Sequence, residues 1–415
     1  MFFYISFLRP PPTQSSPSTP IHITPQISND LRTEPYTDSQ DIYYSWAPYP
    51  QPAHPPPPSL PPQPTSPTQY LKTTRPIKLT TYRPSSLFKE IPVPPPLGVR
   101  ENQQWQLILS ATPSKTPNYI IDLGESNVGH GIPFPVISMP VVFSAKGVSK
   151  GGGGKKQERV ERIYRFSNGR AGGEESGNTE VVMDFCDLKI TEQTSFDLDK
   201  NDQFREQKIW DSGIGLSSWL AEFKASDQNR LGEPLDILWD GLFSSEARHI
   251  IELGAGTGIV SLTLASLRNS LSHLNSPTPD KVIATDLESA VPLLNHNISS
   301  NHSLYPTNTP QADILDWDEE ELPESVTSLG SIDVILMSDV TYNTDSFPAL
   351  LSTTSKLLRI GDKPPVILLG YKERHEAERS LWSMMESIGV RLEKIGQRRG
   401  FADPPVEIWF GRVFR

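Results

Sequence analysis

Two patterns of apolar residues run along the chain. In residues 206–415, short apolar runs alternate with longer segments in which apolar residues recur at helical spacing. The runs predict strands at 249–253, 281–285, 333–337, 365–369, 390–395 and 406–413, and the longer segments predict helices at 259–267, 290–298, 347–358 and 374–388. This alternation predicts an α/β fold with a mainly parallel sheet and helices on both faces. The last two strands have no helix between them, which predicts an antiparallel hairpin at the sheet edge.

Residues 99–205 contain short apolar runs without this alternation. We expect strands at 105–109, 119–123, 160–166 and 181–190, with a polar loop at 168–179. Four glycines at 151–154, flanked by lysines, cannot form the interior of a regular element. They lack the G-x-x-x-x-G-K-[ST] spacing of a phosphate-binding loop, so we interpret them as a solvated insertion. The region is predicted to be a β-rich extension with Gly-rich insertions.

Residues 1–98 are set apart by proline. They hold 24 of the 41 prolines, including the runs 55–58 and 94–96. Proline removes backbone donors and opposes both helices and ladders, so we predict a disordered tail with polyproline II character. Such a tail is either a spacer or a docking site for proline-recognition domains. The expected division is a disordered Pro-rich tail (1–98), the β-rich extension (99–205) and an α/β domain (206–415).

Charge and cysteine content limit the function classes. The chain has 49 acidic and 38 basic residues and a net charge of −11, which argues against a general nucleic-acid backbone binder. Cys186 is the single cysteine, which excludes a disulfide framework and a Cys-rich zinc site and favours a reducing compartment. The sequence contains no run of 18 apolar residues, so we expect no membrane-spanning helix. The apolar start of the chain lacks the basic region of a signal peptide. We therefore expect a cytoplasmic location, extending also to the nucleus, no membrane partner and no metal.

The motif E-L-G-A-G-T-G at 252–258 lies where a predicted strand passes into a predicted helix. Glycines at this point let the backbone turn tightly and approach a ligand closely. The dinucleotide fingerprint G-x-G-x-x-G is not matched, because the spacing here is G-x-G-x-G and Ile259 occupies the place of the last glycine. The loop predicts ligand contacts from Gly254, Ala255 and Gly256; the alternative is a simple tight turn.

Two further residues extend this predicted site. Asp286 ends the next predicted strand, where a carboxylate can bridge two ribose hydroxyls; alone, it would read as a helix N-cap. Trp317 follows the presumed third strand, where an indole can stack on a purine; alone, it would read as a packing residue. Together with the glycine loop they predict a nucleoside-binding pocket.

These motifs resemble the class I, seven-β-strand S-adenosylmethionine-dependent methyltransferases. More narrowly, the chain is similar to the family-16 protein-lysine methyltransferases, the methyltransferase-like 21 group and its fungal relatives. Three segments carry the resemblance: I-W-D-S-G-I-G-L at 209–216, the glycine loop, and S-D-V-T-Y at 338–342. It covers about residues 190–415 and does not reach the proline-rich region. Residue 338 is Ser where the family often has Ala, a change that leaves a backbone contact intact.

The resemblance implies a Rossmann-like seven-stranded methyltransferase sheet, S-adenosylmethionine as cofactor and a protein substrate bearing the target lysine. Asp339 and Tyr342 would orient the acceptor amine and help to remove its proton. Trp210 and Ser338 would contact the cofactor. Other interpretations are a helix cap for Asp339 and helix packing for Trp210. A monomer is expected.

Other function classes stay open at this stage. Enzymes that methylate amide or exocyclic nitrogens commonly carry an Asn/Asp-Pro-Pro-Tyr/Phe loop after the fourth strand, and this chain has Asp-Val-Thr-Tyr at 339–342. Nucleic acid is therefore an unlikely substrate. The alternatives to a protein-lysine methyltransferase are a small-molecule or nucleic-acid methyltransferase and a non-catalytic scaffold with the same fold.

Overall fold

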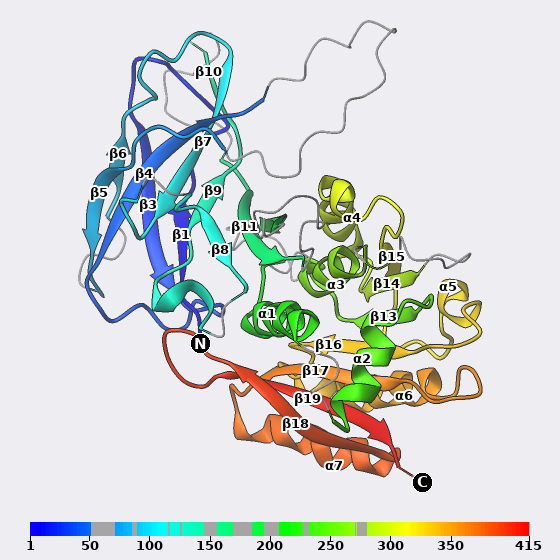
Figure 1. Ribbon diagram of the computed structural model, residues 1–415. Helices are drawn as coiled ribbons and strands as arrows, with labels where there is room; N and C mark the ends of the chain where they lie inside the picture. Colours follow the sequence, from blue (N-terminus) through cyan, green and yellow to red (C-terminus); the bar gives the residue numbers. More distant parts are fainter. Residues whose placement is uncertain are drawn as a thin grey trace, which may run out of the picture.

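The computed structural model describes residues 1–50, 71–84, 89–114, 117–124, 127–144, 156–168, 185–194, 207–226, 232–269, 271 and 280–414. Figure 1 shows two parts side by side: a β-rich part formed by the chain up to β12 (Phe185–Gln193) and an α/β part that begins with α1 (Asp211–Ala225). The predicted Gly-rich insertions at 151–154 and most of the loop at 168–179 lie outside the described residues.

The α/β part is built on a seven-stranded sheet in the order β15-β14-β13-β16-β17-β19-β18. Its strands are β13 (His249–Leu253), β14 (Lys281–Asp286), β15 (Gln311–Ile314), β16 (Val334–Ser338), β17 (Val366–Lys372), β18 (Val390–Arg398) and β19 (Val406–Val413). Strands β13 to β17 are parallel, and β19 pairs antiparallel with both β17 and β18. The predicted α/β fold class and its edge hairpin are confirmed.

Alternating side chains of the central strands supply two separate cores. In β13, Ile250 packs with α1, α2 and α3, whereas Ile251 packs with α6 and α7 on the opposite face. A strand that is covered on both faces is typically a nearly continuous apolar run, and three of the five residues at 249–253 are apolar. The helices are α1, α2 (Leu235–Phe243), α3 (Ile259–Asn269), α4 (Val291–Ser300), α5 (Glu324–Thr327), α6 (Phe347–Leu357) and α7 (Ser380–Ser387). Among the described residues, no helix is both long and apolar enough to cross a membrane.

The β-rich part contains two sheets that enclose a core of their own. The smaller sheet has the order β1-β3-β6, with β1 (Tyr4–Arg9), β3 (Ile21–Ser28) and β6 (Ile91–Val93). The larger, nine-stranded sheet contains β2 (Gln14–Ser15), β4 (Gln40–Pro48), β5 (Ile77–Tyr82), β7 (Gln103–Ser110), β8 (Ile120–Asp122), β9 (Val136–Ser138), β10 (Val141–Phe143), β11 (Arg159–Ser167) and β12. Side chains from both sheets, such as Ile5, Ile23 and Trp46, meet in this core.

The prediction of a disordered tail at 1–98 is wrong for its described residues. They form β1 to β6, and Phe2, Ile5, Ile23 and Trp46 are almost completely buried. The prolines are placed where strands tolerate them: Pro25 lies opposite Phe7 beside an irregularity in the β1–β3 register, and others fall in loops. The prediction is wrong because it relies on the high proline content and disregards the short runs of alternating apolar residues that form these strands. The run 55–58 lies outside the described residues.

The two parts share one hydrophobic core. Tyr4, Tyr164 and Leu188 of the β-rich part pack in the same cluster as Ile214 of α1 and Val260 of α3. A shared apolar core joins two segments far more strongly than a flexible linker does. The β-rich part is therefore an integral support of the α/β part.

Hydrogen bonds reinforce this junction next to the glycine loop. The Asn297 side chain on α4 accepts from Thr191 N at 2.9 Å and donates to Thr191 O at 3.1 Å and Thr257 O at 2.9 Å. One buried amide thus links β12, α4 and the glycine loop.

Candidate active site

A cavity of about 630 Å³ opens at the carboxyl ends of β13, β14 and β16, where the first turn of α1 meets the sheet. Sites at this edge are the rule in parallel α/β sheets. The cavity is lined by all of the residues predicted from the sequence: Trp210, Gly254, Ala255, Gly256, Asp286, Trp317, Ser338, Asp339 and Tyr342. The fold brings together motifs that are up to 132 residues apart in the chain.

The glycine loop between β13 and α3 needs its glycines for backbone geometry. Gly254, Gly256 and Gly258 all have positive φ, at 67°, 56° and 84°, where a side chain would be strained. A Cβ at Gly258 would also come within 2.5 Å of Leu294 Cδ1, whereas one at Gly256 would meet open space. Gly256 therefore presents bare backbone to the cavity, as a ligand cradle requires.

Asp286, the last residue of β14, holds the glycine loop in this shape. Its Oδ2 accepts from Gly256 N at 2.7 Å, and its Oδ1 accepts from the adjacent Leu287 N, also at 2.7 Å. Burial raises the pKa of Asp286, and the two N–H donors oppose that rise. Each carboxylate oxygen has two lone pairs, so both oxygens keep acceptor capacity for a ligand with two adjacent hydroxyls.

Trp317 forms another part of the cavity wall. A Cβ at Gly254 would lie 3.4 Å from Trp317 Cζ2, so the indole edge packs directly over the glycine loop. The Trp317 backbone oxygen accepts from Thr353 Oγ1 of α6 at 3.4 Å, which fixes the segment after β15. The indole thereby offers an aromatic surface beside the vicinal-hydroxyl acceptor, a combination that fits a nucleoside.

Glu252, also part of the glycine-loop motif, was not assigned a role from the sequence. It is fully buried at the end of β13, where its Oε2 accepts from Ser261 N at 3.1 Å and from Ser261 Oγ. Burial raises its pKa to about 8, against the opposing effect of the Ser261 hydrogen bonds. The glycine loop is thus anchored to the first turn of α3 by a carboxyl group that is protonated at neutral pH.

Replacement of Glu252 by Gln should change how stability depends on pH. In the unfolded chain Glu252 ionises near pH 4.5, but in the folded protein it keeps its proton up to about pH 8. Unfolding therefore releases a proton between these values, and stability falls as pH rises through this window. Glu252→Gln removes that loss, which is worth a few kcal/mol at about 1.4 kcal/mol per pKa unit. Urea unfolding at pH 5 and pH 8 should show the variant gaining stability over the wild type; parallel curves would contradict this assignment.

Asp339 follows β16 directly and adopts a strained backbone. Its φ is 56°, a left-handed value that is uncommon outside glycine and often marks functional positions. Its Oδ2 accepts from Ser212 N at 2.8 Å, and its Oδ1 forms an ion pair with Arg374 Nη1 at 2.5 Å. The carboxylate thus holds the start of α1, and it lines the cavity at the same time. Ser338, the preceding residue, ends β16 and also lines the cavity.

Trp210 and Tyr342 form an aromatic corner on this side of the cavity. Their ring centres are 5.5 Å apart, and the Tyr342 side chain is 49% exposed, so it stands at the cavity mouth. Trp210 is the residue before α1, and the guanidinium carbon of Arg374 lies 4.9 Å from the centre of its ring. An aromatic corner beside a carboxylate is suited to an amine carried on an alkyl chain.

Sequence reasoning also missed Asp30, Leu31 and Arg374 in this region. Leu31 lines the cavity although it belongs to the β-rich part. No local motif surrounds Asp30 and Leu31, and the proline content of the region predicts a tail, so only the fold reveals them. Within the described ranges, no group of three or more His, Cys, Asp or Glu residues is arranged to hold a metal ion.

Replacement of Asp286 by Ala should weaken binding of a nucleoside ligand by about 1–3 kcal/mol, because the hydroxyl acceptor is lost. The glycine loop also loses the hydrogen bond to Gly256 N. Calorimetric titration with S-adenosylhomocysteine measures the effect. Asp240→Ala, an exposed carboxylate that pairs with Arg248 at 3.0 Å outside the cavity, serves as the control and should bind normally. Unchanged affinity in Asp286→Ala would rule out the assignment.

The chain is similar to known lysine methyltransferases over its α/β part. A family model described as lysine methyltransferase matches residues 188–388. The protein-lysine N-methyltransferase EFM6 of Saccharomyces cerevisiae is 28% identical over 185 residues, which cover 43% of this chain and 68% of that protein. The protein N-lysine methyltransferase METTL21A of Danio rerio is 30% identical over 179 residues, which cover 40% of this chain and 74% of that protein. A UPF0665 family protein of Schizosaccharomyces pombe is 29% identical over 194 residues, and the chain spans about half (49%) of its length.

Proposed function

Because the chain belongs to the lysine methyltransferase family, we propose that it transfers a methyl group to the side-chain amine of a lysine in a protein substrate. One observation carries this proposal: a single cavity joins a nucleoside cradle, made by the glycine loop, Asp286 and Trp317, to the carboxylate of Asp339. An enzyme of this class needs both features at one site, the first for the donor and the second for the acceptor.

The cofactor is S-adenosylmethionine, and the described residues fit it. Asp286 offers acceptors to the ribose hydroxyls, Trp317 offers a surface to the adenine, and the bare backbone at Gly256 permits close approach. The volume of about 630 Å³ falls within the range of roughly 300–1,000 Å³ that small-molecule sites occupy. When bound, this cofactor supplies an electrophilic methyl group on a sulfonium centre.

The contribution of the protein is positioning and proton removal. A lysine amine must be neutral to act as a nucleophile, although its usual pKa is about 10.4. Asp339 attracts the ammonium form and orients it, and Tyr342 with Trp210 encloses its alkyl chain. The ammonium proton then passes to the Asp339 carboxylate, which frees the lone pair of the amine nitrogen as the nucleophile. Holding the two reactants in near-attack geometry supplies most of the acceleration for such a transfer.

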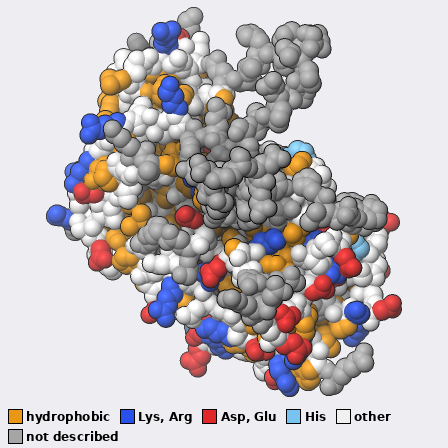
Figure 2. All heavy atoms as spheres, in the orientation of Figure 1, with side chains coloured by type: hydrophobic (Ala, Val, Ile, Leu, Met, Phe, Trp, Pro, Cys, Tyr) orange, Lys and Arg blue, Asp and Glu red, His pale blue; other side chains and the backbone are white. Residues whose placement is uncertain are grey.

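The other expectations about partners and place are parts of the same proposal. The acidic balance and the mixture of acidic and basic side chains over the described part of the face in Figure 2 favour a protein over nucleic acid as substrate. We assign the enzyme to the cytoplasm or the nucleus, acting as a monomer. A small-molecule or nucleic-acid acceptor is the competing assignment.

Transfer of labelled methyl groups into a cell lysate tests the proposal. The purified protein is incubated with S-adenosylmethionine labelled on its methyl group and with lysate from which small molecules have been removed. We expect label in a small number of protein bands, sensitive to protease and resistant to nuclease, and reduced when Asp286→Ala replaces the wild type. Label that nuclease removes, or label confined to added small molecules, would contradict the proposal.

A further inference from the structure

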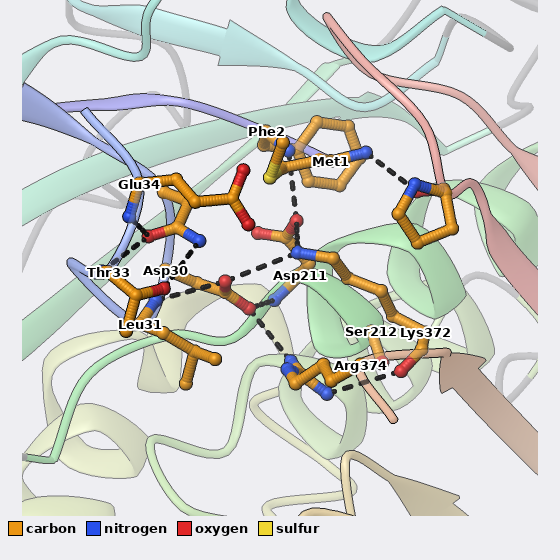
Figure 3. A network of polar contacts seen from close by, with 12 residues as sticks. Met1, Phe2, Asp30, Leu31, Thr33, Glu34, Asp211, Ser212, Lys372 and Arg374 are labelled. Carbon is orange, nitrogen blue, oxygen red and sulfur yellow. Dashed lines mark hydrogen bonds and ion pairs between the residues drawn. The ribbon is translucent and has the colours of Figure 1, made fainter. Parts of the chain in front are cut away.

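A buried cluster of charged side chains lies beside the cavity, and one member comes from the β-rich part. Asp30, in the loop after β3, is 2% exposed. Its Oδ2 accepts from Arg374 Nη2 at 2.8 Å and from Asp211 N at 3.2 Å, and its Oδ1 accepts from Lys372 Nζ at 3.2 Å. Lys372 also pairs with Asp211 Oδ2 at 2.7 Å. Figure 3 shows these side chains converging from the β-rich part, α1 and the end of β17.

Arg374 connects this cluster to the cavity. One nitrogen of its guanidinium reaches Asp30, and the other reaches Asp339 at 2.5 Å. The planar fork of arginine presents a separate nitrogen to each of the two carboxylates in a fixed geometry. The same two carboxylates accept the first N–H groups of α1, Asp30 from Asp211 and Asp339 from Ser212. Asp30 and Asp339 are therefore held in one frame by Arg374 and the helix start.

The ion-paired side chains are unequal in charge. They comprise three carboxylates, Asp30, Asp211 and Asp339, and two cations, Lys372 and Arg374. With all five ionised, the set carries one negative charge in excess, although burial and the neighbouring Asp30 raise the pKa of Asp211. Asp339 is the carboxylate of the three that lines the cavity, so an incoming cation can neutralise the excess there.

Three other titratable groups lie at the edge of the cluster. Glu378 Oε2 accepts from the backbone N of Arg374 at 3.2 Å, and it brings no positive charge. Burial lowers the pKa of the Met1 amine to about 6, so at neutral pH it is mostly uncharged. Lys208 lies on the cavity wall with its Nζ 5.9 Å from the centre of the Trp210 ring, and it adds a positive charge to that wall which every variant described below retains.

The order of the strands fixes which end of the cavity receives the cation. Asp286 ends β14 and Asp339 follows β16, with the glycine loop of β13 between them. We propose that Asp30 is a positioning residue of the active site, which shares Arg374 with Asp339 and so leaves this end of the cavity with the negative charge that receives a primary ammonium group. The inference rests on the proposed function, since the ammonium group is that of the acceptor lysine. The β-rich part thereby completes the active site.

Two cofactor analogues test this proposal without turnover. S-adenosylhomocysteine lacks a cation at the position of the sulfonium, whereas sinefungin carries a primary amine in place of the methylsulfonium group. Calorimetry on the full chain gives both dissociation constants, and their ratio measures how strongly the Asp339 end of the cavity favours an ammonium group. Asp339→Asn should lower the preference for sinefungin.

Two variants that break the same ion pair should shift this ratio in opposite directions. In Asp30→Asn, Arg374 pairs with Asp339 alone, so the preference for sinefungin should fall at least about fivefold. In Arg374→Gln, Asp339 loses its counter-ion, so the preference should rise by about threefold or more. The affinity for S-adenosylhomocysteine should stay within about threefold in both. A merely structural role for the pair would weaken binding in the same direction in both variants.

Glu192→Gln is the matched control. Glu192 forms an equally buried ion pair with Arg162, at 2.7 Å, within the β-rich part. Its loss should leave the ratio unchanged.

The proposal would be overturned if the preference for sinefungin changed in the same direction in Asp30→Asn and Arg374→Gln, or if it did not change in either variant. Should Asp30→Asn fail to fold, the direction found for Arg374→Gln decides alone, and a ratio that falls or stays constant overturns it. A wild-type protein that binds neither analogue would contradict the proposed function itself.

Discussion

Removal of residues 1–98 is expected to prevent the α/β part from folding stably. Sixteen of the described residues in this segment are buried hydrophobic side chains, and Phe2 and Tyr4 pack directly in the core that contains α1 and α3. Each such side chain contributes about 1.5–3 kcal/mol, whereas the whole stability of a domain is about 5–15 kcal/mol. The truncated chain should be largely insoluble and should lack a cooperative melting transition, as judged by circular dichroism and calorimetry.

The same deletion also removes the polar partners of α1. Asp211 Oδ1 accepts from Tyr4 OH at 2.7 Å and its Oδ2 from Phe2 N at 2.9 Å, so a fully buried carboxylate would lose two donors. A buried charge with its partners removed is strongly destabilising. A soluble truncated protein that melts within a few degrees of the wild type would show that residues 1–98 are a dispensable extension.

Asp339→Asn is expected to lower kcat/KM for lysine methylation at least roughly tenfold, the low end of what positioned acid–base groups contribute. Asn keeps the shape of the side chain and an acceptor for Ser212 N, but it removes the charge that attracts the ammonium. The affinity for S-adenosylhomocysteine should change by less than about threefold, which is under 1 kcal/mol. Initial rates on the labelled protein substrate, combined with calorimetry, separate the two effects.

The matched control for this prediction is Asp345→Asn. Asp345 lies in the short helical turn Thr344–Ser346 just after the same motif, and it is exposed and outside the cavity wall. It should methylate at the wild-type rate. If Asp339→Asn did so as well, Asp339 would act only as the cap of α1 that the structure shows, and the acceptor site would need another residue.

The sequence was sufficient to predict those parts of the fold that local patterns determine. The run at 249–253 and the glycines that follow it specify a strand, a tight turn and a helix, and the structure has all three within residues 249–269. The cavity residues were also predictable, because each lies at the carboxyl end of a parallel strand or at the start of α1, and these ends meet at one edge of the sheet.

The β-rich part was not predictable in the same way. Its strands pair across large separations, such as β2 with β10 and β4 with β7, and no local signal encodes these pairings. High proline content also hid the alternation in β1 and β3. Leu31 reaches the cavity and Asp30 reaches Arg374 only through this long-range pairing. For the same reason, the link from Asp30 through Arg374 to Asp339 could not be inferred from composition or motifs.

The identity of the methylated amino acid tests the central claim most directly. Proteins labelled in the lysate reaction are isolated, hydrolysed completely to amino acids and separated beside standards of methylated lysine, arginine, histidine and glutamine. The account predicts that the label co-elutes with one or more methyl-lysines and that it is greatly reduced for Asp339→Asn but not for Asp345→Asn. Label found in another methylated amino acid, with none in lysine, would contradict it.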